Sequence, residues 1–253
     1  MSSPASTRSS IPLLPAGECH VWWASAAAAQ GHLMPLLDPG ERERWSRFRR
    51  EDDRARYLAA HALKRIVVAG LLGMPAGALG FSAVCRRCGG AHGKPRLQEP
   101  AAAIEFSLSH SGERVVLAVA RGGAELGVDV ERLVPQRDRG SLAPAVLSAT
   151  EQRVVAALPP ARRPLALLRY WTRKEALLKA TGDGLAVAPA TLTVSAPDAP
   201  PALLSWTAET PLDAPAYLFD LSPGPGHVAS LAILGARLAI VERAAGDRLL
   251  TGR

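Results

Sequence analysis

This chain of 253 residues has only three cysteines and no hydrophobic run long enough to cross a membrane. An uncharged stretch, residues 66–81, is interrupted by glycine or proline at five positions and falls short of the roughly 20 apolar residues that span a bilayer. We therefore expect no membrane segment. Three cysteines are too few, and odd in number, for a disulfide framework, and without an export signal they favour a reducing, cytoplasmic location.

The composition is that of a folded and basic protein. Hydrophobic residues make up 48% of the chain, which allows a full core and excludes a disordered chain. Lysine and arginine outnumber aspartate and glutamate by 30 to 23, a formal net charge of +7, so the surface should attract anionic partners. Charge alone does not choose among phosphates, nucleic acid and acidic proteins.

Hydrophobic periodicity predicts helices followed by strands, twice along the chain. Residues 41–72 are predicted to form a surface helix pair, and a second long helix should run from Pro164 to Ala180 and end at the following glycines. Period-two patterns predict an antiparallel meander, and shorter runs predict further strands. The meander covers residues 104–109, 115–120 and 126–131, and the further strands are 19–23, 192–194, 203–207, 216–221 and 227–234.

This order predicts an α+β fold of two pseudo-symmetric subdomains, each a small antiparallel sheet packed with helices. Gly122 and Gly123 mark the expected boundary, which divides the chain into residues 18–122 and 123–253. Residues 1–17, whose short apolar stretch is broken by prolines, are predicted to be a flexible tail.

Two acidic residues alternate with apolar ones in Gly127-Val-Asp-Val-Glu131. On a strand, Asp129 and Glu131 share one face, about 6.5 Å apart along the chain. Leu126, Val128 and Val130 then point to the other face, into the core. Such a pair repels itself unless a cation or a shared proton intervenes, and its oxygen donors suit a magnesium ion that keeps several waters. The alternative is a solvated strand end with ordinary surface acids, which these five residues alone favour.

A second segment, Trp171-Thr-Arg-Lys-Glu-Ala-Leu-Leu-Lys179, places Glu175 and Lys179 four residues apart on one helix face. In isolation the better interpretation is a surface ion pair worth about 0.3–0.5 kcal/mol. However, residues 153–179 contain seven basic residues and one acid. This setting predicts a phosphate site beside a third metal ligand.

The third segment is Phe106-Ser-Leu-Ser-His-Ser-Gly112. Ser109 and His110 are neighbours on an extended chain and so point to opposite sides, which argues against a serine–histidine nucleophile pair. A histidine, a hydroxyl and a glycine at a strand end can instead bind a phosphate. A plain hydrogen-bonded turn explains the pattern equally well.

Together the three segments resemble the Sfp-type 4′-phosphopantetheinyl transferases, in sequence, order and spacing, over residues 41–185. The segment ending at Lys179 matches the family's helix signature at every defined position, whereas Ser107 replaces an asparagine that is frequent in relatives. The resemblance implies the transferase fold, with its active site in the cleft between the two halves. Because both halves belong to one chain, a monomer is expected.

The resemblance also implies roles for individual residues. Asp129, Glu131 and Glu175 would hold Mg²⁺ against the diphosphate of coenzyme A, with Glu175 also the base for the carrier serine and Lys179 neutralising the phosphate or the leaving group. Four further residues would hold the adenosine 3′-phosphate and the diphosphate: Arg56, Lys94, Ser109 and His110. The products would be adenosine 3′,5′-bisphosphate and a holo carrier protein of fatty-acid, polyketide or nonribosomal peptide synthesis. These carriers are generally acidic, which suits the basic surface, and residues 133–158 are the expected contact.

Two other functions compete with this prediction. A carrier-binding relative without activity would normally have lost one of the three carboxylates, yet all are present. A nucleic-acid-binding protein would need a concentrated basic face with aromatics, whereas the arginine-rich residues 41–56 carry seven arginines and five acids and are predicted to be a mixed, solvated helix.

Cys85-Arg-Arg-Cys88, followed by His92, has the spacing of half a zinc site, with Cys19 as a distant fourth ligand. A single Cys-x-x-Cys does not make a zinc module, so a thiol-bearing loop is the favoured interpretation. Stoichiometric zinc in the purified protein would reverse it.

Overall fold

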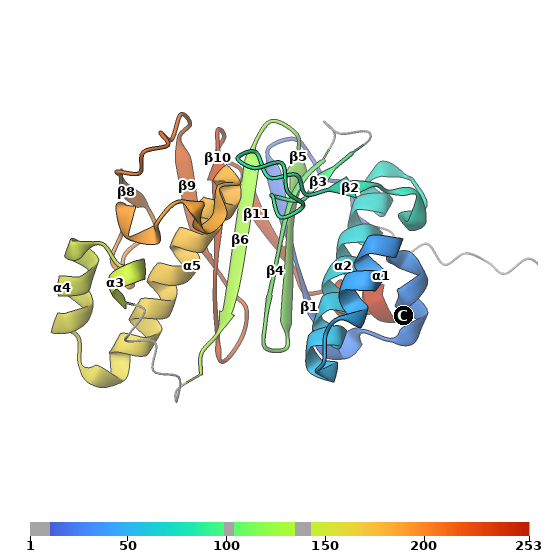
Figure 1. Ribbon diagram of the computed structural model, residues 1–253, viewed down its shortest axis with the longest axis horizontal. Helices are drawn as coiled ribbons and strands as arrows, with labels where there is room; N and C mark the ends of the chain where they lie inside the picture. The colour runs from blue at the N-terminus through green and yellow to red at the C-terminus, as the bar shows by residue number, and fades with distance from the viewer. Residues whose placement is uncertain (1–10, 99–103, 135–142, 253) are drawn as a thin grey trace, which may run out of the picture.

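Two small sheets, each covered on its outer side by one long helix, form the core of the molecule (Figure 1). The computed structural model describes residues 11–98, 104–134 and 143–252. The first sheet has the strand order β11-β1-β5-β4 and packs against α2, and the second has the order β6-β10-β9 and packs against α5. The α+β prediction is confirmed. The main elements are β1 (Glu18–Ser25), α2 (Glu51–Leu72), β4 (Ile104–Ser111), β5 (Arg114–Arg121), β6 (Glu125–Arg132), α5 (Arg163–Thr181), β9 (Ala216–Leu221), β10 (His227–Leu234) and β11 (Ala239–Arg243).

Shorter elements surround this core. Among the described residues they are α1 (Pro39–Ser46), β2 (Phe81–Ser82), β3 (Arg96–Leu97), α3 (Ala143–Val146), α4 (Ala149–Ala157), β7 (Leu192–Val194), β8 (Leu203–Trp206), α6 (Gly246–Thr251) and single 3₁₀ turns. The predicted helix pair at residues 41–72 is present as α1 and α2. Within the described part of the chain, no helix is both long enough and apolar enough to span a membrane.

Strand β5 is buried on both faces, which explains why the two sheets stack. Its alternate residues Val115, Leu117 and Val119 pack toward α2, whereas Val116 and Ala118 pack in the cluster that joins the two sheets. A third cluster lies between α5 and the second sheet. The period-two pattern of the sequence therefore fills two core layers from one strand.

The predicted three-stranded meander is wrong at its last strand, because β6 pairs with β10 rather than with β5. β6 instead runs beside β4, and serine side chains join the two strands (Figure 1). The hydroxyl oxygens of Ser107, Ser109 and Ser111 accept hydrogen bonds from successive alternate backbone N–H groups of β6, at 2.9, 3.4 and 3.1 Å. Side chains thus replace the main-chain ladder where the two sheets meet, a pairing that hydrophobic periodicity does not encode.

Gly127 explains how closely β6 approaches α5. A Cβ atom at this position would lie 1.9 Å from the carbonyl oxygen of Ala176 and 2.4 Å from the backbone nitrogen of Ala180. Any side chain would force the strand off the helix. The glycine therefore brings the acidic residues of β6 against the helix that carries Glu175.

Both ends of the described chain depart from the predicted division. Residues 11–17 are not a loose tail, because Leu14 is 1% exposed and its carbonyl accepts a 2.7 Å hydrogen bond from Arg121. The rest of the predicted tail, residues 1–10, lies outside the described residues. β11, which was assigned to the second subdomain, pairs in parallel with β1 of the first sheet. Its Glu242 accepts a 2.7 Å hydrogen bond from Trp23, and α6 then packs on α2, so the chain ends on the half where it began.

Candidate active site

The acidic residues of β6 and the motif helix α5 meet at one place, beside the serines of β4. Asp129 is 4% exposed. One of its carboxylate oxygens, Oδ1, accepts from the Ser109 hydroxyl at 2.9 Å and from the Lys179 ammonium at 2.7 Å. Lys179 also donates to Ser109 and to the Val128 carbonyl, at 3.0 and 3.2 Å. Strand, helix and serine ladder are therefore tied together at this carboxylate.

Two carboxylate oxygens of the site are buried without a hydrogen-bond partner among the described residues. They are Oδ2 of Asp129 and Oε1 of Glu175. Burial raises the pKa of Asp129, and the charge of Glu131 raises it further, against the opposing effect of Lys179. Burial, followed by the charge of Asp129, likewise raises the pKa of Glu175. Buried polar atoms are normally paired, so these oxygens mark a place that suits a cation or a hydrogen-bond donor.

Glu131 lies at the open end of the same strand face. Its Oε2 accepts a 3.0 Å hydrogen bond from Ser111, and the residue lines a cavity of 810 Å³ together with Arg56. Its charge raises the pKa of both Asp129 and Glu175. The three carboxylates predicted from the sequence are thus close enough to act on one another. The oxygens of these three carboxylates do not all lie within 4.8 Å of one another. Among the described residues, the group of three possible metal ligands that does meet this distance is Cys85, Cys88 and His92.

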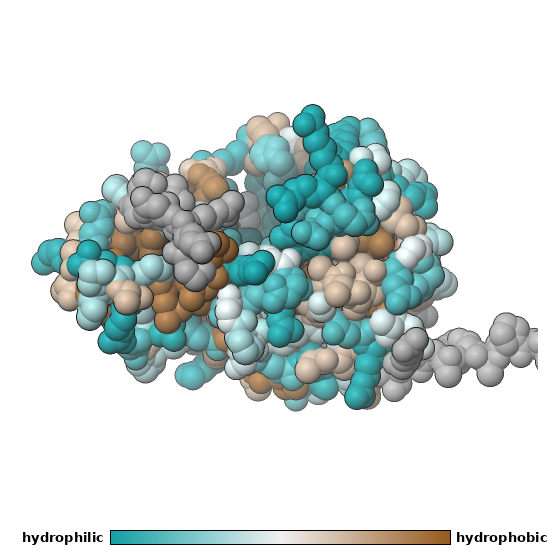
Figure 2. All heavy atoms as spheres, turned by 90° about the horizontal axis from the view of Figure 1, so that it is seen from below, coloured by the Kyte–Doolittle hydropathy of each residue, from teal (hydrophilic) through white to brown (hydrophobic). Residues whose placement is uncertain are grey.

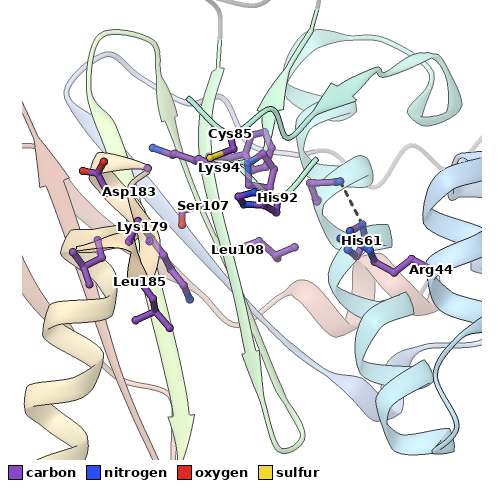
Figure 3. Close-up of a pocket in the computed structure, with 18 residues that line it drawn as sticks. Arg44, His61, Cys85, His92, Lys94, Ser107, Leu108, Lys179, Asp183 and Leu185 are labelled. Atoms are coloured by element: carbon purple, nitrogen blue, oxygen red, sulfur yellow. Dashed lines mark hydrogen bonds between the residues drawn. The ribbon is translucent and has the colours of Figure 1, made fainter. Parts of the chain in front are cut away.

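A second cavity, of 530 Å³, is lined in part by Lys179 (Figure 3). Arg44 and His61 reach it from α1 and α2, Lys94 and the loop before it form another wall, and Leu185 follows α5. Four of its lining residues are lysine or arginine and one is aspartate, but Lys64, Lys94 and Lys179 are each paired with a carboxylate. Seen from below, hydrophilic side chains gather over the half that contains α1 and α2 (Figure 2).

Comparisons with known proteins match both halves of the chain. The family model described as 4′-phosphopantetheinyl transferase superfamily matches residues 125–231, and the model described as 4′-phosphopantetheinyl transferase, N-terminal, matches residues 21–122. The 4′-phosphopantetheinyl transferase HetI of Nostoc sp. is 32% identical over 224 residues, which cover 86% of this chain and 88% of that protein. The chain belongs to the 4′-phosphopantetheinyl transferase superfamily.

Other relatives match parts of the transferase. The 4′-phosphopantetheinyl transferase AcpT of Salmonella typhi is 40% identical over 93 residues, 37% of this chain and 47% of that protein. A holo-(acyl-carrier-protein) synthase from Bacillus anthracis, solved in complex with CoA (3′,5′-ADP), covers 44% of this chain and 96% of its own at 20% identity and a TM-score of 0.38. Membership of the superfamily makes the protein an enzyme that transfers phosphopantetheine to carrier proteins.

The remaining residues predicted to bind coenzyme A fall in different surroundings. Ser109 lies inside the carboxylate cluster, while His110 points to the other side of β4 and is exposed, as the strand alternation predicted. Arg56 lines the larger cavity and pairs with Asp53. Lys94 lines the smaller cavity, but its ammonium is already held by two carboxylates.

Lys94 connects the two halves of the transferase. Its Nζ lies 2.6 Å from Glu105 of β4 and 2.6 Å from Glu125 of β6, and it is 3.3 Å from the Ala180 carbonyl of α5. A phosphate would have to displace one of these carboxylates to reach it. The geometry therefore favours a bridging role for Lys94 over direct contact with coenzyme A.

The basic stretch 153–179 does not form one phosphate surface, contrary to the interpretation from charge counting. Arg173 and Lys174 are both 0% exposed. Arg173 is held by Asp220 and by several carbonyl groups, and Lys174 by Glu151. The helix signature thus contains two buried structural cations, and only Lys179 of the basic residues in the signature reaches the site.

Sequence reasoning missed two residues of the smaller cavity, Arg44 and His61. The segment 41–56 was predicted to be a solvated helix, yet Glu41 is 8% exposed and accepts from His61, Lys64 and Arg65, each at 2.8 Å. Burial of a carboxylate with three basic partners is a tertiary feature. The only local signal was the capping box between Asp38 and Glu41, which fixes the start of α1.

His110 should report on the binding of coenzyme A. The ring of His110 is largely shielded from water and lies near the charge of Arg56, which together lower its pKa to about 4. Lys179 and His61 add to this effect, while another part of the residue faces solvent. A bound diphosphate or 3′-phosphate would offset these cations. We therefore expect coenzyme A to raise the pKa of His110, with proton uptake on binding between pH 4 and the higher value.

An NMR titration of the imidazole resonances, with and without saturating coenzyme A, measures this shift, and His110→Gln assigns the signal. His32 contacts Leu250 and lines neither cavity, so it serves as the internal reference. An unchanged His110 titration in the complex would place the phosphates elsewhere.

Proposed function

We propose that this transferase moves the 4′-phosphopantetheine arm of coenzyme A to a serine hydroxyl of an apo carrier protein, with Mg²⁺ held by Asp129, Glu131 and Glu175. The observation that carries the proposal is the pair of buried carboxylate oxygens, on Asp129 and Glu175, that have no hydrogen-bond partner among the described residues. They lie where β6 meets α5, and Lys179 of α5 and Glu131 of β6 each line one of the two cavities.

A magnesium ion fits this donor set. Carboxylate oxygens are hard ligands, and Mg²⁺ is commonly bound through one or two carboxylates together with substrate phosphates and waters. Burial raises the pKa values of Asp129 and Glu175, and repulsion by neighbouring carboxylates raises them further; a bound cation would offset both effects. When bound, Mg²⁺ would neutralise the diphosphate of coenzyme A and hold it in place.

The residues of the chain supply the remaining chemistry. Glu175, whose Oε1 has no hydrogen-bond partner among the described residues, is suited to take the proton of the carrier serine. The serine oxygen then forms a bond to the β-phosphorus, and the bond from that phosphorus to the bridging oxygen breaks, releasing adenosine 3′,5′-bisphosphate. Lys179, whose side chain is 30% exposed, places a positive charge beside the reacting phosphates.

Carrier proteins of fatty-acid, polyketide or nonribosomal peptide synthesis are the proposed acceptors. Their generally acidic surfaces complement a chain of net charge +7. The contact predicted at residues 133–158 includes α3 and α4 beside α5, whereas residues 135–142 lie outside the described residues. Val134, the last residue described before that segment, lines the larger cavity together with Glu131, which supports a carrier contact beside the site.

Arg56→Ala should weaken the binding of coenzyme A. Arg56 lines the larger cavity, pairs with Asp53 and lies close enough to His110 to lower its pKa. Loss of one charged hydrogen bond, worth about 1.5–3 kcal/mol, predicts a KM for coenzyme A about 10- to 100-fold higher with kcat less affected.

Arg47→Ala is the matched control for that experiment. Arg47 follows α1, is 71% exposed and pairs with Glu43. Its replacement should leave the KM unchanged. Equal KM values for the two variants would remove Arg56 from the coenzyme A site.

Intact-mass spectrometry tests the function directly. The transferase is incubated with coenzyme A and Mg²⁺ and, in separate reactions, with apo carriers of the three classes. We expect at least one carrier to gain the mass of one phosphopantetheine arm, and the gain to disappear with a chelator or with Asp129→Asn. No gain on any carrier, or an undiminished gain in the variant, would contradict the proposal.

A further inference from the structure

A cluster of two cysteines and a histidine lies in the loop between β2 and β3, outside the carboxylate site. One ligand atom from each of Cys85, Cys88 and His92 lies within 4.8 Å of the other two, and Cys88 Sγ is 3.0 Å from His92 Nε2. Sequence spacing alone did not show that His92 folds back onto the cysteines. Cys19, considered as a fourth ligand, is 0% exposed in the core between the two sheets and does not take part.

The loop around Cys85 is closed by backbone hydrogen bonds. The turn closes through Gly89, whose N–H donates to the Cys85 carbonyl at 2.9 Å and whose φ of +72° is the left-handed conformation that glycine tolerates. The Cys85 N–H in turn donates to the Gly90 carbonyl at 2.8 Å.

The second arm of the loop is held against the first at Gly93. Its N–H donates to the Ala83 carbonyl at 2.7 Å, and a Cβ atom on it would lie 2.3 Å from the Val84 carbonyl oxygen. Only glycine permits this crossing. The crossing returns His92 to the cysteine turn, so the backbone itself brings the three side chains together.

The donor set selects the ligand. Two thiolates and one imidazole are soft and borderline donors, which favour Zn²⁺ over the hard cation proposed for the carboxylates. Tetrahedral bonds of about 2.3 Å to sulfur and about 2.0 Å to nitrogen place ligand atoms roughly 3.5–3.8 Å apart. The three atoms need only small shifts to reach this spacing.

We propose that Cys85, Cys88 and His92 bind one Zn²⁺ ion, with water as the fourth ligand. Cys88 and His92 are exposed, so solvent reaches the cluster. Cys85 and His92 also line the 530 Å³ cavity, immediately before Lys94 (Figure 3). The ion would therefore fix the loop that forms one wall of that cavity, apart from the carboxylates proposed to hold Mg²⁺.

Metal content of the full-length, tag-free protein, purified with a reductant and without chelators, tests the site independently of phosphopantetheine transfer. We expect about one zinc per chain, and about one Co²⁺ after exchange, with the visible bands of a tetrahedral ion and a thiolate-to-cobalt charge-transfer band. A zinc content below about a fifth of an equivalent after loading with Zn²⁺ would overturn the proposal. An intact mass two hydrogens lower, marking a Cys85–Cys88 disulfide in the reduced preparation, would overturn it as well.

Variants separate this cluster from other thiols. Cys88→Ser and His92→Gln change exposed side chains, so both should fold and lose the metal and the cobalt bands. Cys19→Ala removes the thiol that lies outside the cluster and should keep one metal ion. If both cluster variants retain the metal ion, other residues bind it. The cobalt spectrum of the unmodified protein reports thiolate ligation directly, so the test does not depend on the folding of either variant.

Discussion

Replacing Glu175 with glutamine will abolish transfer without destabilising the fold. Within the described part of the chain, one buried oxygen of Glu175 has no hydrogen-bond partner, and burial raises the pKa of this residue, so the folded state disfavours its charged form. Above that pKa the ionised carboxylate therefore costs stability, and glutamine removes its repulsion with Asp129 and Glu131. The same change removes the proposed base and one metal ligand, so kcat should fall by at least about 10²- to 10⁴-fold.

The two readouts are the rate of carrier modification and the thermal midpoint of unfolding. We expect the midpoint to stay the same or rise at neutral pH while activity is lost. Glu209→Gln is the control, because Glu209 is exposed and belongs to the same half of the chain. A Glu175 variant that retains activity, or loses it only through unfolding, would remove Glu175 from the mechanism.

Lys174→Met should have the largest effect on stability among the changes considered. The Lys174 ammonium donates to Glu151 and to the carbonyls of Val146 and Pro189, and the side chains of the ion pair are 0% and 1% exposed. Removing one partner leaves the charge of Glu151 buried and unpaired, which costs about 3–5 kcal/mol. At about 2–4 °C per kcal/mol, the melting temperature should fall on the order of 10 °C.

Arg169→Met is the matched control on the same helix. Arg169 pairs with Asp198, whose side chain is 63% exposed, so this ion pair should contribute no more than about 1 kcal/mol. Chemical denaturation of the two variants compares the free energies of unfolding. Similar losses would show that burial does not distinguish the two cations of the helix.

Local sequence patterns predicted the elements that place the site. The alternation in β6 correctly put Asp129 and Glu131 on one face with buried apolar neighbours, and helical spacing correctly put Glu175 and Lys179 on α5. Both are short-range regularities of backbone geometry. Their chemistry followed from the resemblance to a family, which the comparisons confirm.

Long-range contacts were beyond the reach of the same patterns. Nothing local indicates that serines of β4 would join it to β6, or that β11 would pair with β1 across the whole chain. Counting charges also failed, because Lys174 and Glu151 neutralise each other inside the core although they are 23 residues apart. The roles of Lys94 and Lys174 were decided by partners brought from elsewhere in the fold.

A crystal structure of the transferase with coenzyme A and Mg²⁺ tests the central claim most directly. We predict one ion bound by oxygens of Asp129, Glu131, Glu175 and the diphosphate, at about 2.0–2.1 Å, with the Lys179 ammonium beside the phosphates. Coenzyme A bound with its diphosphate away from these carboxylates, or an ion that none of them contacts, would contradict the account.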